Sequence, residues 1–280
     1  MTLRVDAHQH FWSVARGDYP WLTPALTPLY RDFGPDDLAP LLRSAGIGAT
    51  VLVQAAPTSA ETRFMLDIAE ETDWVAGVVG WVDFESPAAT DEIAELADHP
   101  KLAGIRAMIQ DIDDDGWVLK PVLDPAFAAL EESGLVFDAL VHPRHLKNLL
   151  RRLERHANLR AVIDHCAKPS IRECAFEPWA TDMARLARET AAFCKVSGLV
   201  TEAASEWRPA DLRPYFEHVL EHFGADRLVW GSDWPVCTLA APYEEWHSAA
   251  KDLASGLGGS DAEALFGGNA IRLYRLQVGG

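Results

Sequence analysis

Three histidines and one aspartate in this sequence have the types and spacing needed to hydrolyse an acyl group. His8 and His10 are two residues apart, so on a strand both imidazoles point to the same side. His165 and Asp233 each follow a short apolar run rich in β-branched residues. Imidazole and carboxylate groups together can polarise a carbonyl, take a proton from water or bind zinc. These four residues are the predicted catalytic centre.

Each of these features also has an ordinary structural explanation. A His-x-His pair on an arbitrary strand is a weak sign of ligands, and Asp233 could cap the helix that follows it. Arg106 could form a structural ion pair with Asp111 or another acid, and His142 could be a hydrogen-bonded residue at a strand end. Buried polar groups cost free energy unless they are partnered, so their presence at the ends of many strands favours the chemical interpretation.

The elements that position these residues follow from the apolar pattern of the chain. Predicted strands cover about residues 3–8, 49–54, 75–81, 102–107, 135–142, 160–165, 193–197 and 228–233. Predicted helices cover 35–45, 60–71, 90–97, 125–133, 144–156, 179–190, 212–223 and about 260–276. Eight strands alternating with helices predict an α/β fold, a (β/α)8 TIM barrel formed by residues 1–280 as one domain. An open doubly wound sheet is the alternative, but no GxGxxG loop follows the first strand.

In a barrel of this kind the chemistry lies at the C-terminal ends of the strands. The inward positions there are predicted to be His8 and His10, Gln54, Trp81, Arg106, His142, His165, Lys195 or Ser197, and Asp233. Of these, Gln54, Trp81, Arg106 and His142 are the predicted substrate contacts, and Trp12 is expected to offer a sugar-like ring an apolar face.

Composition excludes several classes of partner. The formal net charge is −17, which disfavours binding to nucleic acid or to an anionic membrane surface. No run approaches the roughly 20 apolar residues of a membrane span. The 4 cysteines include no CxxC pair, and no apolar segment precedes Leu3, so a reduced, cytoplasmic protein without a signal peptide is expected. The expected partner is a small-molecule substrate.

Several motifs together resemble one known family. The first strand, Val5-Asp6-Ala7-His8-Gln9-His10-Phe11-Trp12, resembles the first-strand metal motif of the amidohydrolase superfamily. Gly231-Ser232-Asp233-Trp234-Pro235 resembles its eighth-strand aspartate motif, and Gly268-Asn269-Ala270 with Leu273-Tyr274 resembles its C-terminal helix. The stretches 50–54, 104–108, 143–146 and 162–165 resemble the amidohydrolase-related branch that contains sugar-lactone hydrolases of the L-fuconolactonase and L-rhamnono-lactonase type, together with 2-pyrone-4,6-dicarboxylate hydrolase.

The resemblance implies roles for individual residues. His8 and His10 would be first-strand ligands or carbonyl-binding groups, His165 the sixth-strand histidine, and Asp233 the eighth-strand general base. Arg106 and Met108 stand where two-metal members carry a bridging lysine or glutamate on the fourth strand. At most one divalent ion is therefore expected, with zinc the expected metal, and it could be dispensable. Its ligands would come from a set that the resemblance defines: His8, His10, His142, His165 and Asp233.

The chemistry implied is the opening of a small sugar lactone by water that Asp233 activates. No GxSxG elbow is present, so no serine nucleophile is predicted. A 2-pyrone-4,6-dicarboxylate-type hydrolase is a second candidate, but a dicarboxylate needs several arginines and only Arg106 is predicted on a strand, with Arg144 close behind another. A metal-dependent decarboxylase of the same superfamily and a non-catalytic binding protein also remain open.

Overall fold

Parallel pairing joins every strand to the next one in chain order. The computed structural model describes residues 2–278, and its sheet has the order β1-β2-β3-β4-β5-β6-β7-β8. The strands are β1 (Val5–Gln9), β2 (Ala49–Val53), β3 (Val75–Gly80), β4 (Leu102–Ala107), β5 (Val136–Ala139), β6 (Ala161–Ile163), β7 (Phe193–Val196) and β8 (Leu228–Trp230). The sheet closes where Gln9 pairs with Trp234 and the His10 amide donates to the Trp234 carbonyl at 2.7 Å. The predicted (β/α)8 barrel is confirmed.

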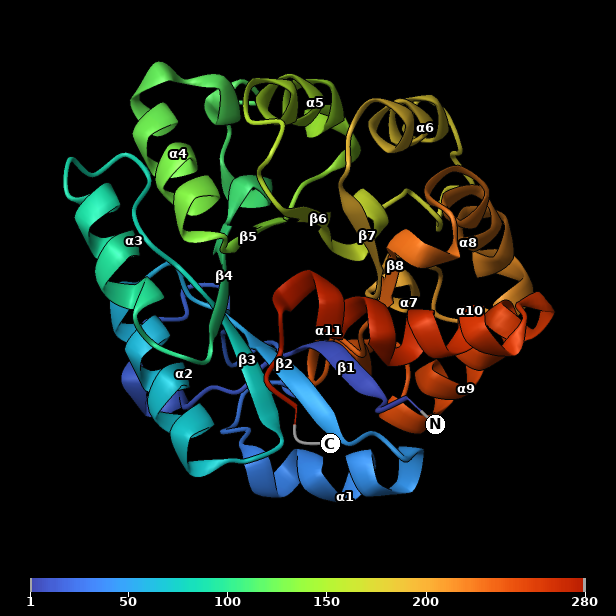
Figure 1. The fold of residues 1–280 in the computed structure, drawn as a ribbon. Helices are drawn as coiled ribbons and strands as arrows, with labels where there is room; N and C mark the ends of the chain where they lie inside the picture. The colour runs from blue at the N-terminus through green and yellow to red at the C-terminus, as the bar shows by residue number, and fades with distance from the viewer. Residues whose placement is uncertain (1, 279–280) are drawn as a thin grey trace.

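Helices surround this ring of strands (Figure 1). The main ones are α1 (Pro35–Ala45), α2 (Ser59–Glu71), α3 (Ala89–Ala97), α4 (Asp124–Ser133), α5 (Leu146–Arg155), α6 (Trp179–Glu189), α8 (Pro209–Phe223) and α9 (Tyr243–Leu253). All but α9 were predicted to within a few residues. No helix in residues 2–278 is long and apolar enough to cross a membrane.

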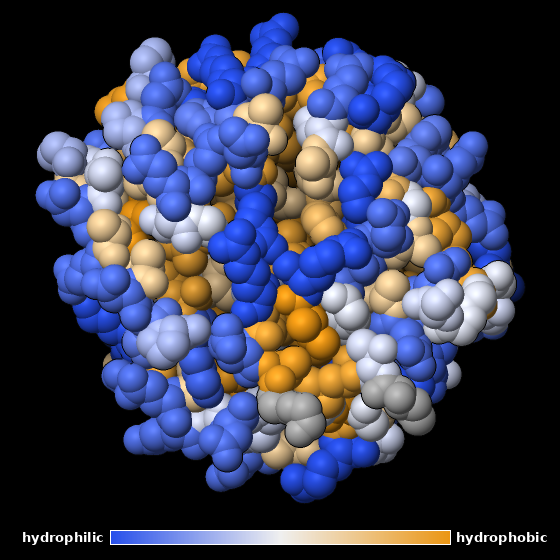
Figure 2. Space-filling model, viewed as in Figure 1, coloured by the Kyte–Doolittle hydropathy of each residue, from blue (hydrophilic) through white to orange (hydrophobic). Residues whose placement is uncertain are grey.

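The last predicted helix is divided into three parts. It consists of α10 (Gly259–Glu263), a π turn over Ala264–Gly268 and α11 (Asn269–Tyr274). Figure 1 shows α11 lying across the end of the barrel at which β1 begins, and Figure 2 shows the same face, largely hydrophilic with an apolar area near its centre. Tyr274 is 4 % exposed and its hydroxyl donates to Asp138 Oδ2 at 2.8 Å. This helix therefore closes the end of the barrel opposite the predicted site.

Close contact between β8 and β1 requires a glycine after β8. A Cβ built on Gly231 would lie 2.6 Å from the Cβ of His8 and 3.0 Å from its backbone nitrogen. No side chain fits at these distances without moving the backbone of β1. The position of His8 therefore depends on the absence of a side chain at Gly231.

We expect Gly231→Ala to lower the free energy of unfolding by about 1–3 kcal/mol, the usual cost of overpacking a well-packed interior. Hydrolytic activity should fall as well, because His8 moves. Chemical denaturation and kinetics check both effects. Gly256→Ala is the control, since a Cβ there meets nothing within 4 Å. Equal stability of the two variants would show that β1 and β8 tolerate a wider separation.

Candidate active site

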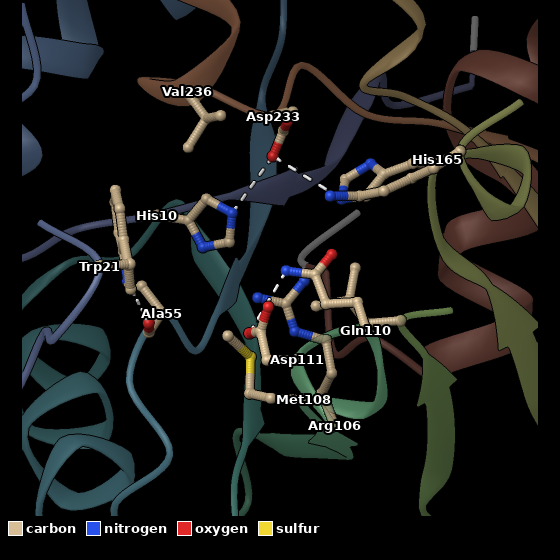
Figure 3. A pocket seen from close by; sticks show the side chains of 12 residues that line it. His10, Trp21, Ala55, Arg106, Met108, Gln110, Asp111, His165, Asp233 and Val236 are labelled. Atoms are coloured by element: carbon tan, nitrogen blue, oxygen red, sulfur yellow. Dashed lines mark hydrogen bonds and ion pairs between the residues drawn. The ribbon is translucent and has the colours of Figure 1, made fainter. Parts of the chain in front are cut away.

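A cavity of about 210 Å³ opens at the C-terminal ends of the strands. Its lining combines polar groups with apolar ones: His10, Trp21, Ala55, Arg106, Met108, Gln110, Asp111, Leu140, His165, Lys168, Asp233 and Val236. Figure 3 shows His10 and His165 on either side of Asp233, with Arg106 and Met108 further down the wall. The lining can therefore both bind hydroxyl groups and exclude water from an apolar surface.

Three imidazoles converge on one oxygen of Asp233. Its Oδ1 lies 3.2 Å from Nε2 of His10, 3.6 Å from Nε2 of His8 and 3.9 Å from Nε2 of His165. All four side chains are nearly or wholly buried, with at most 4 % exposure. Burial alone would raise the pKa of Asp233, but the nearby His165 and the hydrogen bond with His10 outweigh it and hold the pKa below its usual value. The Asp233 carboxylate is directed at the histidines. The Cys237 amide donates to the backbone carbonyl of Asp233, at 2.8 Å, and not to its side chain.

Left-handed backbone places both His165 and Asp233. Residues 165–168 have φ between 50° and 59°, and Asp233 has φ 59°. This conformation costs roughly 1–2 kcal/mol per residue for any residue other than glycine. Surrounding contacts must offset the cost: Trp179 Nε1 donates to the Cys166 carbonyl at 2.6 Å, and Asp233 N donates to the His8 carbonyl at 2.8 Å. Strain of this kind is typical of functional sites.

The hydrogen bonds of His10 define its tautomer. Its Nδ1 lies 2.7 Å from the Val53 carbonyl, which can only accept, so Nδ1 carries a proton. In the neutral ring, Nε2 then presents a lone pair to Asp233 Oδ1. Two acceptors 3.2 Å apart repel each other, so a proton or a metal ion must lie between them. His10 and Asp233 therefore form a pair that holds a cation.

His165 is held by a hydroxyl group. Its Nδ1 lies 2.8 Å from Ser197 Oγ, at the end of β7. Desolvation is the largest influence on this ring and lowers its pKa to about 4, although Asp233 and Asp164 oppose the effect. His165 is therefore neutral near pH 7 and can act as a hydrogen-bond partner in the cavity wall.

Beneath the histidines the barrel interior holds a network of charges. Lys195 Nζ lies 2.5 Å from Asp138 Oδ2, 3.1 Å from Asp164 Oδ1 and 3.1 Å from Nδ1 of His8. Arg106 Nη1 donates to Asp164 Oδ2 at 3.1 Å. These five side chains are at most 3 % exposed. Two cations and two carboxylates thus balance each other in a buried space, as a buried ion network requires.

Four of the predicted substrate contacts lie outside the cavity lining. Gln54 is wholly buried and its amide oxygen accepts from Nε of Arg106 at 3.0 Å. Trp12 is 1 % exposed and packs edge-on against Trp21 and Phe33. The prediction that Trp12 faces the substrate is corrected, because its pairing with Phe33 turns it into the aromatic core.

Trp81 and His142 are the other two. Trp81 lines a neighbouring hollow that shares the walls Trp21, Met108 and Asp111 with the cavity. His142 follows β5 by three residues, and its backbone amide donates to His145 Nδ1 at 3.1 Å. It does not belong to either cluster of potential metal ligands found in residues 2–278. Arg106 lines the cavity as predicted, and its acidic partner is Asp164 rather than Asp111.

The loop residues of the cavity were not predicted. Trp21 lies in the long segment after β1, and its Nε1 donates to the Ala55 carbonyl at 2.8 Å. Gln110 and Asp111 follow β4, and Lys168 follows β6. A prediction that uses only the C-terminal ends of strands does not include such loop residues. The available signal was the stretch Met108-Ile109-Gln110-Asp111, which begins two residues after Arg106.

Some of the histidines and carboxylates of the site are close enough together to hold a single metal ion. His8, His10 and Asp233 form one cluster whose ligand atoms lie within 4.8 Å of one another, and His8, Asp164 and His165 form a second. His10 has the arrangement usual for a metal ligand, with its other nitrogen bonded to a carbonyl. The second cluster contains Asp164, which Arg106 and Lys195 already neutralise. The first cluster is therefore the better candidate for an ion.

Comparison with known proteins places this chain in a family. The amidohydrolase family profile matches residues 5–276. The chain belongs to the amidohydrolase family. It is 48% identical over 280 residues to the L-fucono-1,5-lactonase of Burkholderia ambifaria, covering 99% of this chain and 97% of that protein. It is 39% identical to the L-fucono-1,5-lactonase of Burkholderia multivorans, covering 98% and 96%.

A solved structure resembles the amidohydrolase fold found here. The crystal structure of an amidohydrolase from Burkholderia multivorans with bound zinc superimposes with a TM-score of 0.92 at 38% identity, covering 98% of this chain and 99% of that one. A relative with the same fold therefore binds zinc, which makes the His8, His10 and Asp233 cluster worth testing.

Buried neutral histidines predict how the stability of this amidohydrolase depends on pH. Desolvation lowers the pKa of His142, His165 and His247 from 6.5 to about 4. Between pH 6.5 and 4 the unfolded chain therefore binds more protons than the folded protein. The free energy of unfolding has its full value above pH 6.5 and falls as the pH drops toward 4. His247 lies among aromatic rings outside the cavity, and the centroid of its ring is 5.1 Å from the centroid of the Trp230 ring.

We expect His247→Phe to weaken the loss of thermal stability between pH 6.5 and 4, because one proton-binding site of the unfolded state is removed. Melting temperatures measured across this range check it, with activity at pH 7 as the control for an intact site. If the melting temperature of the variant falls as steeply between pH 6.5 and 4 as that of the wild type, His247 ionises equally in the folded and unfolded states.

Proposed function

We propose that this amidohydrolase opens the lactone of a small neutral sugar acid, and that its substrate is L-fucono-1,5-lactone or a near analogue. The observation that carries the proposal is the convergence of His8, His10 and His165 on Asp233 in the wall of a small cavity. Relatives named L-fucono-1,5-lactonase at 48% and 39% identity support the choice of substrate. We expect the enzyme to act in the cytoplasm, in carbohydrate metabolism.

The cavity lining suits a ring with hydroxyl groups on one side. Gln110 offers both a donor and an acceptor, Asp111 offers acceptors and Lys168 offers donors, which together match neighbouring hydroxyls. Trp21 and Leu140 provide apolar surface for the ring carbons or for a methyl group. A site built in this way rejects ligands that lack the hydroxyls, because its own polar groups would then be left unpaired.

The reaction follows from the groups around Asp233. The carboxylate takes a proton from water as the water attacks the lactone carbonyl. A ring N–H of His165 and the guanidinium of Arg106, both in the cavity lining, stabilise the negative charge that forms on the carbonyl oxygen. The ring oxygen then leaves as an alkoxide, and the proton held by Asp233 returns to it. No covalent intermediate with the protein is needed.

A divalent ion would be held by His10 and Asp233, with His8 or His165 as the next candidate. We propose at most one ion per chain, with zinc the expected metal. Bound zinc lowers the pKa of a coordinated water to about 7 and so supplies hydroxide near neutral pH. The proton chemistry of Asp233 and the histidines is available with or without it.

The proposed substrate is tested by a panel of lactones followed with a pH indicator. We expect L-fucono-1,5-lactone and related aldonolactones to be opened with release of one proton, and unsubstituted butyrolactone to react far more slowly. The panel includes 2-pyrone-4,6-dicarboxylate and aromatic carboxylates. Preference for the dicarboxylate, or proton uptake with release of CO2, would replace the proposal by a dicarboxylate hydrolase or a decarboxylase.

We expect Asp233→Asn to lower kcat by about 10²- to 10⁴-fold, the usual effect of removing a general base. The amide cannot take the proton, while its size leaves the cavity unchanged. Asp111→Asn is the matched control: it changes an exposed carboxylate at the rim, so we expect it to alter KM more than kcat. An Asp233→Asn variant that retains a tenth of wild-type turnover would leave Asp233 with a structural role only.

A further inference from the structure

Two residues of the cavity wall are held by one short segment of backbone, residues 54–56, directly after β2. The side-chain oxygen of Gln54 accepts from Nε of Arg106 at 3.0 Å and from its Nη2 at 2.8 Å. The carbonyl of Ala55 accepts from Nε1 of Trp21 at 2.8 Å. Arg106, Trp21 and Ala55 itself all line the cavity. The shape of this wall therefore depends on where the 54–56 segment lies.

Glu61, outside the cavity, holds that segment. It is the third residue of α2 and is 0 % exposed. The amide of Ala55 donates to its Oε1 at 3.1 Å and to its Oε2 at 2.9 Å, and the amide of Ala56 donates to Oε2 at 2.6 Å. Both oxygens of an ionised carboxylate only accept hydrogen bonds, so the charged side chain suits these two N–H groups.

The same carboxylate is unfavourable for stability. Among residues 2–278 no Lys, Arg or His forms an ion pair with Glu61, and the charged group that acts on it is another carboxylate, Asp18, which pairs with Arg16. Burial raises the pKa of Glu61 to about 7, although its bonds with the backbone N–H groups and the nearby Tyr19 hydroxyl oppose the effect. A raised pKa means that the stability contributed by this group is lost as the pH rises from 4.5 through 7.

We propose that Glu61 is a positioning residue: its carboxylate fixes the 54–56 segment, and through it Arg106 and Trp21, at the expense of stability. Functional sites commonly trade stability for activity in this way. The effect on rate rests on the proposed function, in which Arg106 stabilises the charge on the carbonyl oxygen. The effect on the position of Trp21 holds whatever the substrate is.

Glu61→Gln separates positioning from a merely structural role. The carboxamide has the same size, but it has one acceptor oxygen, and its NH2 group would point a donor at the Ala55 amide. We expect kcat/KM for L-fucono-1,5-lactone to fall by about tenfold or more, because small displacements of catalytic groups are costly. The melting temperature at pH 8 should stay at or above that of the wild type, since a buried charge is removed. A structural role would lower both.

Glu71→Gln is the matched control, because Glu71 is an exposed glutamate at the end of the same helix. We expect it to change neither kcat/KM nor the melting temperature at pH 8.

Hydrogen exchange of the Trp21 indole N–H provides a measurement without substrate. It is followed by NMR of protein carrying ¹⁵N-labelled tryptophan, with Trp21→Phe used to assign the signal. We expect faster exchange in Glu61→Gln and wild-type exchange in Glu71→Gln. If no lactone is opened, the proposed function fails, and this exchange rate still decides the role of Glu61. Unchanged exchange in Glu61→Gln, a lower melting temperature at pH 8, or wild-type kcat/KM on an opened lactone would each overturn the proposal.

Discussion

The attraction between the Asp233 carboxylate and the imidazoles around it is the interaction on which this site depends. His8 comes from β1, His10 directly follows this strand, His165 comes from the turn after β6 and Asp233 from the turn after β8. Closing the barrel brings these segments together, and the contact of 3.2 Å between His10 and Asp233 lies where the ring of strands closes. The left-handed backbone at His165 and Asp233 is costly, and it places both side chains at this point. Fold and site are therefore fixed by the same contacts.

The charges beneath the histidines have a comparable role. A barrel of this kind ordinarily fills its interior with layers of branched aliphatic side chains. Here Asp138, Asp164, Lys195 and Arg106 occupy part of that space, and each ion is paired. A buried ion network adds little stability over an apolar core of the same volume, but removing one member is costly. The network therefore holds Lys195, Asp164 and Arg106 in fixed positions beneath the histidines.

Much of the fold could be predicted because local rules agreed with the final structure. Prolines at helix starts and glycines at helix ends marked α1 and α4, and short β-branched runs marked all eight strands. The same alternation placed His8 and His10 together and brought Arg106 to the cavity. The helix α9 was missed because no strand separates it from the last predicted helix, so it falls outside the alternation of strands and helices.

The remaining errors have a common physical cause. Inward and outward positions alternate only while the strand is regular, and β1 ends at Gln9. Trp12 lies beyond that end, so its expected direction was wrong. His165 was placed as the last residue of a strand, whereas the chain leaves β6 at Ile163 and turns left-handed. Trp21 belongs to a loop, and no strand pattern could have predicted its place in the cavity wall.

In the proposed reaction, water activated at Asp233 attacks the lactone carbonyl directly. Single turnover of L-fucono-1,5-lactone in H2¹⁸O, followed by mass spectrometry of the product and of the peptide that contains Asp233, tests it most directly. We expect one ¹⁸O atom in the carboxyl group of the sugar acid and none in the peptide. Label in Asp233, or an unlabelled product from the first turnover, would show instead that the carboxylate attacks the substrate itself and that a covalent intermediate forms.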